Sequence, residues 1–136
     1  MSEAAAPPDR RGEASSRIST RVVAIFKDYL GRGPTRARTI IRDNLVVCLL
    51  EDSLTRAERS LALGGRDATV RDLRREFQEV MEGDLRAAVE EILGRRVIAF
   101  MSANHTDPDY LAEVFVLEDD DGDDAFDGAM LTAVRD

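Results

Sequence analysis

The feature that most constrains the fold is a run of six consecutive apolar residues, LVVCLL at positions 45–50. Such a run is typical of an interior strand covered on both faces, although periodicity alone does not distinguish it from a buried helix. Residues 35–42 before it are rich in β-branched side chains, and Asp43-Asn44 between the two segments suits a two-residue turn. The sequence therefore predicts a β-hairpin over residues 35–50.

Three helices are predicted, the first and the third from apolar residues that recur at steps of three and four. The first covers residues 16–30 and ends at Gly31, which suits the left-handed position after a helix. Thr55 and Thr69 are each followed three residues later by an acidic residue, which is the capping-box spacing of a helix start. The second of these patterns begins a long helix over about residues 69–94.

Two further extended segments, residues 96–102 and 110–118, complete the folded region, and the turn-forming residues 103–109 connect them as a loop. Because an isolated hairpin is at best marginally stable, we expect both hairpins to join one sheet. The predicted fold is α+β in the order α-ββ-α-α-ββ. It has two layers, a four-stranded and mostly antiparallel sheet made from two hairpins, and helices on one face.

The net charge of −8 is concentrated at the C-terminus, where residues 118–136 hold eight acidic residues and one arginine. Residues 1–15 lack periodicity and are predicted to be a disordered tail, followed by the folded domain at 16–118. Residues 119–136 are predicted to be an acidic tail, with apolar side chains spaced as in a short terminal helix. That segment is either a frayed end or an amphipathic anchor for this domain or a partner. Its apolar residues are Phe126, Met130, Leu131 and Val134.

Several classes of protein are disfavoured. No apolar run approaches the length of a membrane-spanning helix, and the N-terminus lacks the apolar core of a signal peptide. The single cysteine, Cys48, lies in the apolar run and is predicted to be buried and inert. We therefore expect a soluble, cytoplasmic protein that does not insert into a membrane. Since the body of the chain has no pervasive basic surface, we expect no nucleic-acid partner.

Four arginines, Arg32, Arg36, Arg38 and Arg42, form a candidate site for an anion or an acidic partner. Side chains two residues apart share one face of a strand, so Arg36, Arg38 and Arg42 are expected to lie together with Ile40. Guanidinium groups so placed can bind carboxylate or phosphate. The alternative is a solvated edge strand whose charges form ion pairs or deter edge-to-edge pairing. A phosphate-binding P-loop is excluded because its lysine and its strand–loop–helix order are missing.

A second candidate group is the loop residues Asn104, His105 and Asp107. Histidine and carboxylates can bind metal or transfer protons, but ligands crowded within one short loop make a poor structural metal site. Asparagine, aspartate and proline are also the residues that turns favour. We therefore expect a turn here, with no cofactor or metal and no catalytic residues.

The segments FKDYLGRGPTRARTIIRDNLVVCLLEDSLTRAERSL and FMSANHTDPDYLAEVFVLE resemble the small bacterial MpsC family over about residues 17–118. The likeness lies in the GRGP turn, the DNLVV strand, the LTRAE segment at 54–58 and the NHTDP loop. The resemblance implies a link to a sodium-translocating, membrane-potential-generating system and to membrane partners in ion or bicarbonate transport. It implies no catalytic residue.

The function expected from these observations is that of a non-enzymatic accessory or regulatory protein, self-associating as a homodimer, with a membrane transport protein as a further partner. The alternative is a sensor of a small anion or nucleotide that binds through the arginine-bearing strand. An enzyme that uses His105 and Asp107 would require a defined pocket around them.

Overall fold

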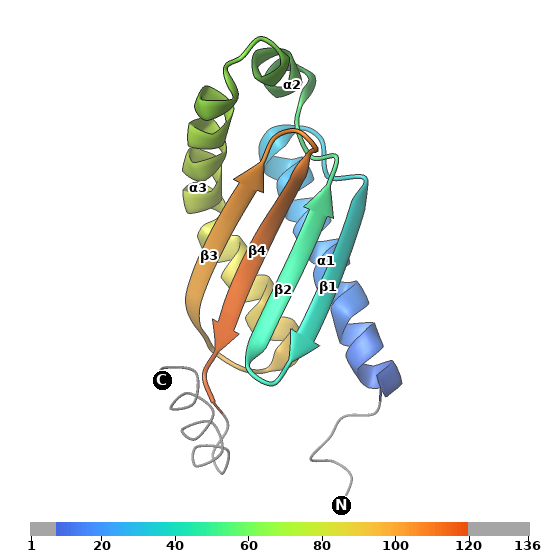
Figure 1. The fold of residues 1–136 in the computed structure, drawn as a ribbon. Helices are drawn as coiled ribbons and strands as arrows, with labels where there is room; N and C mark the ends of the chain where they lie inside the picture. Colours follow the sequence, from blue (N-terminus) through green and yellow to red (C-terminus); the bar gives the residue numbers. More distant parts are fainter. Residues whose placement is uncertain (1–7, 120–136) are drawn as a thin grey trace, which may run out of the picture.

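A computed structural model describes residues 8–119, which form three helices and one four-stranded sheet in two layers (Figure 1). The elements are α1 (Pro8–Leu30), β1 (Arg36–Arg42), β2 (Leu45–Glu51), α2 (Arg56–Leu63), α3 (Asp67–Leu93), β3 (Val97–His105) and β4 (Tyr110–Leu117). The predicted α+β class and the order α-ββ-α-α-ββ are confirmed.

The sheet has the strand order β1-β2-β4-β3, and every neighbouring pair is antiparallel. Each hairpin supplies one inner and one outer strand, and the two hairpins join between β2 and β4, where Cys48 pairs with Glu113. The β1–β2 hairpin turns at Asp43-Asn44, as predicted, with Asp43 in the left-handed region at φ 54°. The apolar run is thus an interior strand.

Helices α1 and α3 lie on the same face of the sheet, which Figure 1 shows from the opposite side. The hydrophobic core lies between these helices and the inward side chains of the strands. Inward residues alternate with more exposed ones along β2 and β4, as a half-covered sheet requires. The core residues are Ile18, Val22 and Phe26 on α1; Met81, Leu85 and Val89 on α3; and Val46, Cys48, Leu50, Val97, Leu111, Phe115 and Leu117 on the strands.

Helix α1 begins at Pro8, so the prediction of disorder for residues 8–15 is wrong. Proline is tolerated in the first turn of a helix because its missing N–H would have no partner there. The arginine, glutamate and alanine residues that follow are good helix formers. These first turns precede Ile18, the first core residue, so they carry no apolar periodicity that would predict a helix. Residues 1–7 lie outside the described part of the chain.

Strand β3 continues to His105, so the prediction of a loop over residues 103–109 is also wrong in part. Ala103 and Asn104 pair with Ala112 and Leu111 of β4, and the remaining turn covers only residues 106–109. The hairpin lengthens because β4 offers paired positions back to Tyr110. The predicted acidic tail and terminal helix at 119–136 lie, apart from Asp119, outside the described residues.

Candidate functional site

The sheet face turned away from the helices, here called the outer face, carries four positions on each strand. These positions alternate with the inward positions of the same strand. They are Arg36, Arg38, Ile40 and Arg42 on β1; Leu45, Val47, Leu49 and Glu51 on β2; Tyr110, Ala112, Val114 and Val116 on β4; and Ala99, Met101, Ala103 and His105 on β3. Within residues 8–119 no helix covers this face (Figure 1).

The middle of the outer face is apolar. Val47 and Leu49 on β2 and Val114 on β4 are half-buried by their neighbours alone. Ile40 and Met101 at the two sides are 65% and 51% exposed. Four strands about 4.8 Å apart and about seven residues long give this face roughly 400 Å² of flat area. The apolar centre makes up part of this area, and exposed apolar patches of a few hundred Å² are often functional.

One side of the outer face is basic. Arg36, Arg38 and Arg42 are all exposed on β1 and share a face with Ile40, as the alternation predicted. Arg36 Nε lies 3.6 Å from a carboxylate oxygen of Glu51 on β2. Arg38 and Arg42 form no ion pair within the part of the chain that the structure describes. Two guanidinium groups are therefore available to an acidic ligand.

Arg32, the fourth predicted member of this group, lies elsewhere and has a structural role. Its guanidinium donates hydrogen bonds to the backbone oxygens of Asp52 and Leu54 at 2.9 and 2.8 Å. It also pairs with the Asp52 carboxylate at 3.3 Å, which accepts a further hydrogen bond from Thr35 Oγ1 at 3.0 Å. These bonds, led by that from Thr35, hold the pKa of Asp52 below its usual range. Arg32 thus ties the loop after α1 to the end of β2.

The three predicted loop residues are separated by the fold. His105 is on the outer face, and its Nδ1 lies 2.8 Å from the backbone oxygen of Pro108 within the turn. Asp107 lies in that turn, whereas Asn104 faces the helix layer. Among residues 8–119, no group of three or more His, Cys, Asp or Glu side chains is arranged to hold a metal ion. The structure therefore does not bring this group together as one site.

Asn104 belongs instead to a buried polar cluster that joins α3 to β3 and β4. Gln78 Nε2 donates to Asn104 Oδ1 at 3.1 Å, and Asn104 Nδ2 donates back to Gln78 Oε1 at 2.9 Å. Gln78 Nε2 also donates to Glu113 Oε2 at 3.0 Å, and the Ser102 hydroxyl donates to Glu113 Oε1. The carboxyl of Glu113 is fully buried at the centre of this cluster.

Burial raises the pKa of Glu113 to about 7, although hydrogen bonds from Ser102 and Gln78 and the charge of Arg74 act in the opposite direction. A carboxyl group is costly to bury in its ionised form, so the neutral form gains population near neutral pH. The cluster therefore contains a side chain that can gain or lose a proton around pH 7.

A second buried polar contact lies one helical turn away on α3. Arg74 is 1% exposed and forms two hydrogen bonds with Glu58 of α2, Nε to Oε2 at 2.9 Å and Nη2 to Oε1 at 2.6 Å. Nη2 also donates to the backbone oxygen of Ser53 at 2.6 Å. Glu58 completes the predicted capping box with Thr55. The pair fixes α2 against α3, because either charge alone would be buried without its partner.

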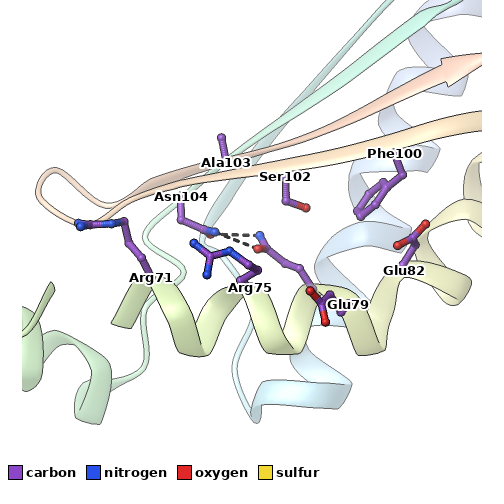
Figure 2. A pocket seen from close by; sticks show the side chains of 9 residues that line it. Arg71, Arg75, Glu79, Glu82, Phe100, Ser102, Ala103 and Asn104 are labelled. Atoms are coloured by element: carbon purple, nitrogen blue, oxygen red, sulfur yellow. Dashed lines mark hydrogen bonds between the residues drawn. The ribbon is translucent and has the colours of Figure 1, made fainter. Parts of the chain in front are cut away.

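A pocket of about 410 Å³ lies between α3 and β3, and the hydrogen-bonded pair Gln78 and Asn104 forms part of its lining (Figure 2). Arg71 and Arg75 lie toward one end, and Glu82 lies beside Phe100 toward the other. Each of these charged residues pairs within α3: Arg71 with Asp67, Arg75 with Asp72, and Glu82 with Arg86. The pocket is polar, and these pairs compensate three of its four charged side chains, the fourth being Glu79.

The sequence interpretation missed Glu113 and Arg74. A signal for both was available. Glu113 has the same parity as Leu111, Phe115 and Leu117, which all face inward on β4. Arg74 lies four residues after Val70, on the buried side of α3. A charged residue at an inward position indicates a buried polar network. Cys48 is buried, as predicted, and burial raises the pKa of its thiol to about 11.

Comparison with known protein families identifies the chain. The family model for the Na⁺-translocating membrane potential-generating system (MpsC) matches residues 10–119. No curated protein and no solved structure matches the chain. None of the helices within the described residues is long and apolar enough to cross a membrane. Since the matched residues make up well over half of the sequence, the protein belongs to the MpsC family.

Proposed function

We propose that this protein is a non-catalytic accessory component of a membrane potential-generating system and binds a partner protein through the outer face. The observation that carries the proposal is an apolar sheet face without a cover. The run LVVCLL is of a kind typical of strands covered on both faces, yet within residues 8–119 helices cover only one. The partner supplies the second cover.

Charge and area indicate what the partner presents. The outer face carries three arginines and, among its sixteen positions, one acidic residue, Glu51. Its flat area of roughly 400 Å² is smaller than the ~800 Å² per partner that a standard interface buries. A single amphipathic segment with apolar and acidic side chains fits both the area and the charge.

A second copy of the chain fits less well. When two sheets pack face to face with their strands aligned, a two-fold axis places β1 of one copy over β1 or β3 of the other. The first arrangement opposes two rows of arginine. In the second, the arginines meet Ala99, Met101, Ala103 and His105, and the outer positions of β3 carry no acidic residue. The homodimer predicted from the sequence is therefore an alternative outcome.

Family membership supplies the biological setting of the proposal. The family description names a Na⁺-translocating system, so we propose a membrane ion or bicarbonate transport protein as the source of the partner segment. In this arrangement the chain acts at the cytoplasmic side of that partner and regulates or stabilises it.

Site-specific photo-crosslinking in the native cell tests this function. A photoreactive residue replaces Ile40 on the outer face, and the matched control replaces Val80 on α3, because the two side chains are 65% and 66% exposed. We expect Ile40 to crosslink to a component of the Na⁺-translocating system and Val80 not to do so. Equal adducts from both positions contradict the proposal. An adduct between two copies of this chain replaces it with the homodimer.

A second candidate function, recognition of a small anion or nucleotide, is favoured by the guanidinium groups of Arg38 and Arg42, which form no ion pair among residues 8–119. Phosphate, bicarbonate and nucleotides then raise the melting temperature of the protein, and the Arg38→Ala/Arg42→Ala variant loses that rise. If the shift is the same in both proteins, the anion does not bind through this strand.

A further inference from the structure

We propose that the chain's own C-terminal segment, residues 120–136, docks on the outer face and competes there with the partner. This inference rests on the proposed function, because it takes the outer face to be a protein-binding surface. It adds a regulatory step: the face is occupied intramolecularly until a partner displaces the segment.

Charge complementarity is the first observation. Residues 120–136 contain six acidic residues and one arginine. The outer face presents Arg38 and Arg42, which form no ion pair among residues 8–119, and Arg36, whose contact with Glu51 is long at 3.6 Å. The folded body at residues 17–117 has equal numbers of acidic and basic residues, so this basic edge is a local feature. An acidic segment gains charge-assisted hydrogen bonds there.

The apolar pattern is the second observation. After its acidic run the segment has four large apolar residues at helical steps: Phe126, Met130, Leu131 and Val134. The outer face offers an apolar centre between the arginines and β3, formed by Val47, Leu49, Val114 and Val116. The segment thus combines acidic residues that match the arginines with apolar residues that match the apolar centre, in one stretch of 17 residues.

The position at which the described chain ends is the third observation. The Leu117 backbone N–H donates to the backbone oxygen of Asn44 at 2.8 Å, so β4 ends beside the β1–β2 turn. Arg42, the last residue of β1, immediately precedes that turn. The acidic residues that follow Asp119 therefore start near the basic edge.

The segment is also long enough. The outer face is roughly 23 Å long along its strands, from seven residues at about 3.3 Å each. Eleven residues in helical form span about 16 Å, and the remainder of the segment bridges the distance from the end of β4. Because the segment is covalently attached to the domain, its effective concentration at the face is on the order of millimolar. A weak contact is then sufficient to keep the face occupied.

Paramagnetic broadening in the full-length chain tests the inference. Thr132→Cys carries a nitroxide label, while the buried Cys48 remains unlabelled. We expect methyl signals of Val47 and Val114 on the outer face to lose intensity relative to the sample with reduced label. The methyl signals of Val80, exposed on α3, keep their intensity. Equal broadening at both places, or none, overturns the inference.

Two controls identify what causes the broadening. In the labelled Arg38→Glu/Arg42→Glu variant, broadening at Val47 and Val114 should fall, and it should fall likewise at high salt because exposed charges are screened. Unchanged broadening in this variant contradicts the charge argument. Mixing isotope-labelled chains without nitroxide and unlabelled chains with nitroxide detects docking between molecules. Broadening that appears fully in this mixture means that the segment of a second copy occupies the face, which overturns the intramolecular model.

The crosslinking test separates this inference from the proposed function. The Met130→Asp/Leu131→Asp variant should increase the yield of the partner adduct from Ile40, because the competing segment no longer docks. If Ile40 crosslinks to the partner but the yield does not change and no broadening occurs, only the inference fails. If broadening occurs but no partner adduct forms from Ile40, the proposed function fails and the face serves the segment alone.

Discussion

Replacing Glu113 by glutamine should make the protein more stable at alkaline pH and leave it nearly unchanged at acidic pH. Glutamine has the shape of glutamate and can keep hydrogen bonds with Ser102 and Gln78, but it does not ionise. Glu113 is fully buried, and its pKa rises from an ordinary value of 4.5 to about 7. The substitution therefore removes the cost of ionising this side chain inside the fold.

The sign follows from proton binding. Between about pH 4.5 and pH 7, the folded state keeps the proton on Glu113 while the unfolded state has lost it. The wild-type protein therefore loses stability as the pH rises through this window, and the loss is complete above the folded pKa. At about 1.4 kcal/mol per pKa unit, the total is about 3 kcal/mol.

Urea unfolding of both proteins at about pH 5 and about pH 8 measures this effect, because other titrating groups cancel in the difference. The free energy of unfolding of Glu113→Gln minus that of the wild type should be roughly 2–3 kcal/mol larger at the higher pH than at the lower. A difference that is constant with pH would refute the reasoning, since it would mean that Glu113 has the same pKa in both states. A difference in stability that grows toward acidic pH would mean that the hydrogen bonds lower the pKa of Glu113 by more than burial raises it.

Three further substitutions test the packing. Arg74→Met leaves the Glu58 carboxylate buried without its partner and should lower the free energy of unfolding by about 3–5 kcal/mol. The melting temperature should then fall by roughly 10–20 °C. A loss of less than about 1 kcal/mol would contradict a buried pair. Gly33→Ala places a methyl group 2.9 Å from the backbone oxygen of Val23 and should lower the free energy of unfolding by about 1–3 kcal/mol. Gly83→Ala meets nothing within 4 Å inside α3 and should raise that free energy by about 1 kcal/mol, so effects of equal sign at the two glycines would be inconsistent with this packing.

The sequence predicted the order of elements because each boundary carries local chemistry. Gly31 has a φ of 82° at the end of α1, and Thr55 accepts a hydrogen bond from the Glu58 backbone in a complete capping box. The similar pattern at Thr69 was misleading, because α3 begins two residues earlier at Asp67. Gly65, at φ 83°, turns the chain so soon after α2 that the next helix starts at once. Spacing identifies a helix start only to within about a turn.

The polar interior could not be predicted in the same way, because it depends on contacts between distant segments. Gln78 and Asn104 are 26 residues apart, and Gln78 and Glu113 are 35 apart. Local patterns show that Glu113 faces inward, but they do not identify which partner meets it across the layers. The interpretation of residues 103–109 as a loop placed Asn104 in a turn, whereas the pairing of β3 with β4 directs its side chain to Gln78.

The outer face is where sequence pattern and described structure differ most, and the difference has a physical consequence. Arginines on the edge strand β1 deter pairing with another sheet edge. They do not explain Val47, Leu49 and Val114, which lie on inner strands where edge pairing cannot occur. Polar residues at those positions would keep the alternation of a half-covered sheet, so the apolar choice costs solubility unless the face is covered. An apolar centre beside a basic edge therefore favours a cover that is itself apolar and acidic.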